Sequence, residues 1–144
     1  DKEYYNNPAL SNFLSLNNDI NELKYILALL NSNMMNWLYR NSFNDVNIKP
    51  TDLELLPIPK IDEESQKPFI KLVDEILEAK QKIKDYKPLL DEAIKNNNFD
   101  REIALKKELE NLENICSTNE KTIDQMVYKL YDLTPDEIKI IEGN

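Results

Sequence analysis

The feature that most constrains the fold is a regular repeat in the C-terminal part of the chain. Successive members of the repeat are separated alternately by four and three positions. The members, apolar except for one asparagine, are Leu105, Leu109, Leu112, Cys116, Asn119, Ile123, Met126, Leu130 and Leu133. A mean spacing of about 3.5 residues is typical of a coiled-coil seam, in which a polar residue such as Asn119 fixes the register at some cost in stability. The repeat predicts one helix over residues 100–133, although residues 117–120 match a capping box and are the competing sign of a break.

A second long helix is predicted over residues 62–95. Its expected buried stripe consists of Phe69, Val73, Ile76, Leu77, Ile83, Leu90 and Ile94. Pro88 interrupts this pattern and predicts a kink or a split just before it. Residues 96–98 are three asparagines, a turn signal, and Asp100 is a suitable cap for the helix that follows. Two helices of about 45 and 50 Å joined by so short a turn are expected to form an antiparallel hairpin.

The N-terminal part of the chain holds bulky apolar clusters and many asparagines. Apolar residues at helical spacing predict one helix over residues 19–40. Short strands are expected at Ala9–Leu16 and around Val46 and Ile48. Residues 51–56 are interpreted either as a single helical turn or as an extended segment. The prolines of Leu56-Pro57-Ile58-Pro59 then predict a stiff, extended connector.

The sequence as a whole predicts a mainly α fold in two parts. Residues 1–60 are expected to form a small α-rich lobe with short strand remnants. Residues 61–144 are expected to form a long antiparallel helical (coiled-coil) hairpin and a short C-terminal helix. Thr134, Pro135 and Glu137 predict the start of that last helix, because they match a capping box with proline at the first helical position.

Composition excludes most kinds of active site. The chain has no histidine, one cysteine (Cys116) and one glycine (Gly143), which excludes histidine-based catalysis and glycine-rich phosphate loops. A net charge of −9 excludes a basic nucleic-acid-binding domain. Residues 62–64 are acidic and are interpreted as solvated surface at a helix start. We therefore expect no catalytic residue and no metal site. The single cysteine and the lack of a long apolar run favour the cytoplasm, with no membrane partner.

Four stretches, in this order, resemble a known family. They are Leu30-Asn31-Ser32, Leu56-Pro57-Ile58-Pro59-Lys60, residues 66–77 (QKPFIKLVDEIL) and residues 123–138 (IDQMVYKLYDLTPDEI). Together they resemble the C-terminal end of bacterial type IIG restriction–modification enzymes and related adenine-specific DNA methyltransferases. The likeness to type I specificity subunits is more distant. In that family this region is the end of a target-recognition domain followed by helices.

The resemblance implies a non-catalytic piece of a longer enzyme. The chain opens with Asp1 and lacks the family's methyltransferase and nuclease motifs, so S-adenosylmethionine and Mg are expected only in upstream domains of the parent. The expected partners are double-stranded DNA, bound through the parent enzyme, and the upstream methyltransferase and nuclease domains. Self-association through the helices is a further option.

Four polar residues are the candidates for contact with DNA: Arg40, Asn41, Lys49 and Lys60. Lysine and arginine bind phosphates, and asparagine can read an adenine edge. The alternative interpretation is a helical protein–protein adaptor without a DNA role. If Arg40, Lys49 and Lys60 share one face and the acidic residues lie elsewhere, DNA recognition is favoured, whereas scattered basic residues would favour the adaptor.

Overall fold

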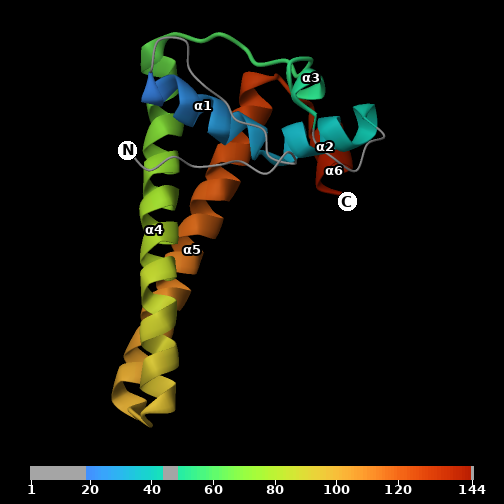
Figure 1. Cartoon of the computed structure of the whole chain (residues 1–144). Helices are drawn as coiled ribbons and strands as arrows, with labels where there is room; N and C mark the ends of the chain where they lie inside the picture. Colours follow the sequence, from blue (N-terminus) through green and yellow to red (C-terminus); the bar gives the residue numbers. More distant parts are fainter. Residues whose placement is uncertain (1–18, 44–48, 144) are drawn as a thin grey trace.

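A long pair of helices dominates the architecture, and shorter helices lie across one end of the pair (Figure 1). The computed structural model describes residues 19–43 and 49–143. The helices are α1 (Ile20–Leu30), α2 (Asn33–Ser42), α3 (Pro50–Leu53), α4 (Glu63–Lys95), α5 (Phe99–Leu130) and α6 (Pro135–Glu142). No strand occurs among the described residues. The two strands expected at residues 9–16 and 46–48 lie outside them, and the mainly α fold class is confirmed.

The antiparallel hairpin is formed by α4 and α5. Its turn is closed by Asn97, which adopts a left-handed conformation with φ of 53°. The backbone N–H of Asn98 donates to the carbonyl of Ala93 at 2.9 Å, and the Asn98 side chain accepts from the N–H of Arg101 at 3.2 Å. Asn98 is therefore the cap of α5, and the prediction of Asp100 was wrong. Asp100 instead lies in the first turn, where its charge favours the helix dipole.

Both long helices are continuous where the sequence contained signs of a break. α4 is a single helix that passes through Pro88, so the predicted split is not observed. Pro88 itself is exposed, while Tyr86 and Leu90 on either side of it are half-buried. We infer that packing on both sides of the proline compensates for the one hydrogen bond that it removes. α5 likewise runs unbroken through residues 117–120.

The seam between the two helices follows the heptad repeat of α5. Leu109, Leu112, Cys116, Asn119 and Ile123 are buried. Leu105, Met126, Leu130 and Leu133, nearer the ends of the repeat, are half-buried.

On α4 the buried or half-buried positions show the same alternation of three and four: Phe69, Leu72, Ile76, Ala79, Ile83, Tyr86, Leu90 and Ala93. The expected stripe was partly wrong, because Leu77 and Ile94 are 46% and 47% exposed. The small side chains of Ala79 and Ala93 also take seam positions and are buried there.

The single helix predicted over residues 19–40 is two helices, α1 and α2. The break falls at Ser32, which is 1% exposed and has an extended backbone. Its Oγ donates to the carbonyl of Leu29 at 2.7 Å and accepts from the N–H of Met35 at 3.3 Å. These bonds satisfy polar groups at the end of one helix and the start of the next. The change of direction lets α1 pack against α4 while α2 reaches α5 and α6.

One hydrophobic core joins the short helices to the hairpin. Tyr25, Ala28 and Leu29 of α1 belong to the same buried cluster as Phe69 of α4 and Val127 of α5. The core thus lies at one end of the hairpin, and the turn between α4 and α5 lies at the far end (Figure 1). The boundary predicted at residue 60 does not separate two cores among the described residues.

The last helix begins as its sequence indicates. Thr134 Oγ1 accepts from the N–H of Glu137, and the Glu137 carboxylate accepts from the N–H of Thr134. Pro135 is the first helical residue. α6 packs beside α2. The chain that leaves α5 therefore ends against the short helices of the lobe.

Candidate functional site

The candidates for DNA contact occupy two separate places. Arg40 and Asn41 lie in the last turn of α2, and Lys49 directly precedes α3. The hydroxyl of Tyr39 donates to a carboxylate oxygen of Asp52 at 3.4 Å, which links α2 to α3.

Lys60 lies three residues before α4, at the other end of the connector that leaves α3 (Figure 1). All four candidates are exposed. The structure therefore brings three of the candidates to one end of the lobe and leaves Lys60 apart from them; their contact with DNA stays a prediction.

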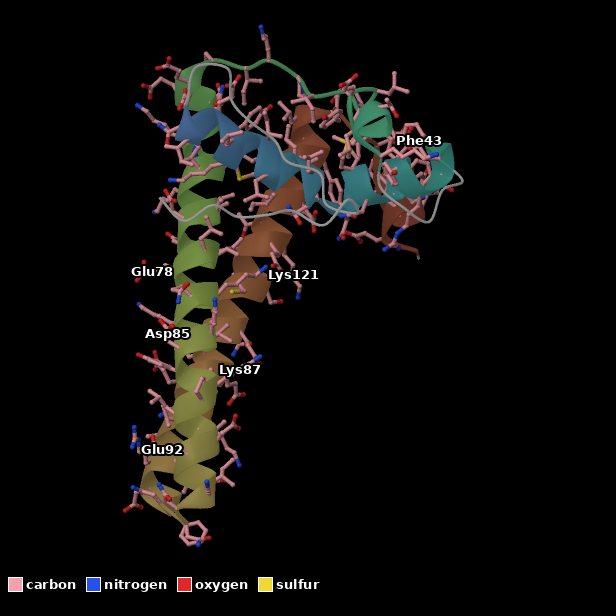
Figure 2. All side chains as sticks on the ribbon, viewed as in Figure 1. Phe43, Glu78, Asp85, Lys87, Glu92 and Lys121 are labelled. Atoms are coloured by element: carbon pink, nitrogen blue, oxygen red, sulfur yellow. The ribbon has the colours of Figure 1, made fainter. Side chains whose placement is uncertain are left out.

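Acidic side chains mark one side of the hairpin. Glu78, Asp85 and Glu92 follow one another at intervals of seven residues on α4 and project from the same side of the helix, while Lys87 and Lys121 lie on the other side in this view (Figure 2). Such a row of carboxylates repels DNA phosphates. Two of these carboxylates are ion-paired, Glu78 with Lys82 and Glu92 with Arg101, so the repulsion from this side of the hairpin is partly compensated.

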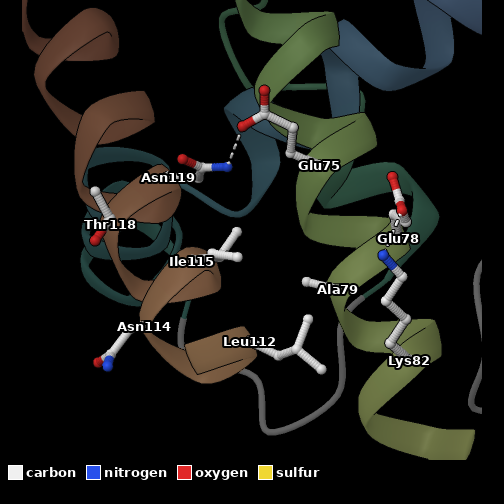
Figure 3. A pocket seen from close by; sticks show the side chains of 9 residues that line it. All are labelled: Glu75, Glu78, Ala79, Lys82, Leu112, Asn114, Ile115, Thr118 and Asn119. Atoms are coloured by element: carbon white, nitrogen blue, oxygen red, sulfur yellow. Dashed lines mark hydrogen bonds and ion pairs between the residues drawn. The ribbon is translucent and has the colours of Figure 1, made fainter. Parts of the chain in front are cut away.

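A buried asparagine joins the two helices near the middle of the seam. Asn119 is 8% exposed, and its Nδ2 donates to Oε2 of Glu75 at 2.8 Å (Figure 3). Close by, Lys80 Nζ forms an ion pair with Glu120 at 3.1 Å. A side-chain amide in an otherwise apolar seam penalises every register in which it finds no partner. Asn119 therefore specifies how α4 and α5 are aligned.

A groove of about 430 Å³ runs beside this asparagine. Its floor is apolar because Ala79 is too short to fill the space next to Leu112 and Ile115 (Figure 3). At its rim Lys82 pairs with Glu78 at 2.7 Å, and the hydrogen bond that Lys82 donates to the Glu78 carboxylate raises the pKa of Lys82. The groove contains no nucleophile with an adjacent base, so its geometry supports packing rather than catalysis.

Cys116 is a seam residue and not a reactive thiol. Its Sγ lies 4.0 Å from the carbonyl oxygen of Ile76, and burial raises the pKa of the thiol above its ordinary value. The protonated thiol is a poor nucleophile and a poor metal ligand. Within residues 19–43 and 49–143, no group of three or more acidic or cysteine side chains is arranged to hold a metal ion.

The joint between the lobe and the hairpin contains contacts that the sequence did not predict. Asp124 of α5 accepts from the backbone N–H of Asn33 at 2.7 Å and from its Nδ2 at 2.9 Å. A carboxylate from α5 thus caps the first turn of α2, and burial raises the pKa of Asp124 above its usual range. Lys24 of α1 forms an ion pair with Asp74 of α4 at 2.6 Å. These pairs are 91 and 50 residues apart in sequence, so no local pattern could have revealed them.

Comparison with known proteins returned no relatives: no family model, no curated protein and no solved structure matches this chain. Among the described helices, none combines the length and the apolar character needed to cross a membrane.

Proposed function

We propose that this chain is the C-terminal part of the DNA target-recognition module of a type IIG restriction–modification enzyme or a related adenine-specific DNA methyltransferase. In this role it performs no chemistry. The lobe contributes contacts to DNA, and the hairpin is a rigid spacer that holds the recognition module at a fixed geometry relative to upstream methyltransferase or nuclease domains. S-adenosylmethionine and Mg would be bound by those domains.

One structural observation carries the spacer part of the proposal. Two helices of 33 and 32 residues, each about 50 Å long, share a core with the lobe at one end and extend well beyond it. A paired, register-specified hairpin resists bending, so it can transmit a distance and an angle between its two ends. Among the described residues, no arrangement of reactive groups competes with this mechanical role.

The DNA part of the proposal is supported by the family resemblance and by the placement of three of the four candidates, whereas Lys60 lies apart from them and does not meet the one-face criterion. Arg40, Asn41 and Lys49 lie at the α2–α3 end of the lobe, away from the acidic row on α4. An overall negative protein limits nonspecific binding, so contact with DNA is confined to the few basic positions.

The DNA role is tested in the full-length enzyme with Arg40→Gln combined with Lys49→Gln. Affinity for double-stranded DNA is measured over a range of salt concentrations. Loss of two phosphate contacts lowers the slope of log K against log salt by about 2.

Lys95→Gln combined with Lys107→Gln is the matched control. Both lysines are exposed, both lie in the half of the hairpin near its turn, and the net charge changes by the same amount. Equal slopes for the two double variants would remove Arg40 and Lys49 from the DNA interface.

A second candidate function, a helical protein–protein adaptor, is favoured by the far end of the hairpin. Ile94, Phe99 and Ile103 are 47%, 68% and 67% exposed there, and apolar groups so exposed often mark a contact surface. An adaptor assembling through this end would lose self-association in Phe99→Ser combined with Ile103→Ser, as measured by sedimentation. Its DNA affinity would be insensitive to the Arg40 and Lys49 substitutions.

A further inference from the structure

The connector between α3 and α4 contains two prolines. At each proline the backbone can be held only through its carbonyl group. Pro57 and Pro59 lack a backbone N–H, so neither can donate a hydrogen bond. Their carbonyl oxygens remain as acceptors. Both carbonyls are bonded, and each bond comes from a tyrosine on a different part of the fold.

Tyr25 of α1 provides the first of these bonds. Its hydroxyl donates to the carbonyl oxygen of Pro59 at 2.9 Å. The residue is 3% exposed, and its ring packs edge-on against Phe69 of α4, with ring centroids 5.5 Å apart. Packing of the Tyr25 ring in the core therefore fixes the direction of its hydroxyl.

Tyr131, the residue that caps the C-terminal end of α5, provides the second bond. Its hydroxyl donates to the carbonyl oxygen of Pro57, and its ring packs against the hydrophobic core. Burial raises the pKa of Tyr131 to about 12, so the phenol remains a donor up to a higher pH than an exposed tyrosine would. Leu56 and Ile58 pack inward on the same segment, at 7% exposed and half-buried respectively.

We propose that Tyr25 and Tyr131 are positioning residues that clamp the connector at Pro57 and Pro59 and so hold Lys60 in a fixed place beside the start of α4. Naming DNA as the target of Lys60 rests on the proposed function, whereas the clamp itself does not. Two anchors from separate helices fix the connector more firmly than one, because releasing it requires both bonds to open.

Trypsin tests the clamp directly, because it cleaves after Lys60 and must bind the preceding residues in a released, extended form. In the full-length protein, Tyr25→Phe and Tyr131→Phe each keep the ring and remove only the hydroxyl. Each substitution should raise the rate of cleavage at Lys60 about fivefold, the change in released population that follows from losing one hydrogen bond. Cleavage at Lys95, beside the turn of the hairpin, should not change. Faster cleavage there would instead indicate a general loss of stability of the fold.

Tyr86→Phe is the matched control. Tyr86 lies about 35 Å from Glu63, the first residue of α4, and is therefore far from the connector. The substitution should alter cleavage at neither lysine. The clamp is overturned if the Tyr25 and Tyr131 variants leave cleavage at Lys60 unchanged, or if they raise it at Lys60 and Lys95 alike.

A second measurement separates the clamp from the DNA function. Lys60→Gln in the full-length enzyme should lower the salt slope for double-stranded DNA of random sequence by about 1. The two Phe variants should weaken the same binding severalfold. Faster cleavage at Lys60 together with an unchanged slope for Lys60→Gln would leave the clamp standing and remove this DNA contact.

Discussion

At the scale of single residues, the protein depends on a few polar groups placed inside apolar surroundings. Asn119 in the seam and Ser32 at the break between α1 and α2 are both buried and both hydrogen-bonded. No buried side-chain nitrogen or oxygen among the described residues lacks a partner. Each group therefore specifies an arrangement: the register of the hairpin in one case and the direction of a helix in the other.

Replacing Asn119 tests whether it provides specificity rather than stability. Asn119→Leu should raise the free energy of unfolding by about 1–2 kcal/mol, because a buried leucine replaces an amide and Glu75 can be solvated by water. Urea unfolding measures this change, and Thr118→Leu at the exposed neighbouring position is the control. A loss of more than about 1 kcal/mol would instead mean that the bond to Glu75 is a main source of stability.

The raised pKa of Tyr131 predicts a dependence of stability on alkaline pH. Its pKa is about 12 in the folded protein against an ordinary value of 10.0. The unfolded chain therefore loses this proton first, and the stability contributed by Tyr131 falls as the pH rises from about 10 to 12.

Urea unfolding at several pH values measures this effect. The free energy of unfolding should decline more steeply above about pH 10 in the wild type than in Tyr131→Phe. Identical slopes would contradict the assigned burial of the phenol.

At the scale of elements, the sequence predicted what depends on local periodicity and missed what depends on distant partners. The repeat in α5 and the capping box of α6 are local patterns; α6 begins where it was expected, whereas α5 ends at Leu130, three residues before the predicted end at Leu133. The break at Ser32 was missed because apolar spacing continues across it, although a serine cap is itself a readable signal. The cap that Asp124 supplies to α2, across 91 residues, has no local signal. For the candidate DNA contacts, residue types could be chosen from the sequence, but their separation into two places could not.

Two serines, one that caps a helix and one that lies inside a helix, provide a test at this scale. Ser32→Ala should lower the free energy of unfolding by about 1 kcal/mol or more, because it removes the cap of α2 and a buried hydroxyl. Ser117, the residue of the unused capping box, is exposed within α5. Ser117→Ala should change stability by less than about 0.5 kcal/mol. Thermal unfolding of the two variants compares them, and a larger effect at Ser117 would contradict the continuous α5.

At the scale of the whole molecule, the hairpin and the short helices form one body because they share a core. The contacts between Cys116 and Ile76 and between Arg101 and Glu92 place residues 84–90 of α4 opposite residues 103–109 of α5. These two segments are equal in length and each spans one heptad. They can therefore be removed together without changing which faces of the helices meet.

Removing both segments tests the spacer role. The doubly shortened protein should still unfold cooperatively, and its largest dimension by small-angle X-ray scattering should fall by about 10 Å. Under the proposed function, DNA binding by the parent enzyme should persist while its DNA methylation falls by at least about tenfold, because the modules are no longer correctly spaced.

Deleting residues 84–90 alone is the control, because it misaligns the seam and should lower the melting temperature sharply. Undiminished methylation by the doubly shortened enzyme would exclude the spacer role.

The cap that Asp124 places on α2 lies at the base of a lever arm. With helices about 50 Å long, a tilt of about 5° at this joint would swing the far end of the hairpin by about 4 Å. A displacement of that size is enough to separate groups in van der Waals contact. The shared core and the polar contacts at the base therefore together determine how accurately the far end of the hairpin is positioned.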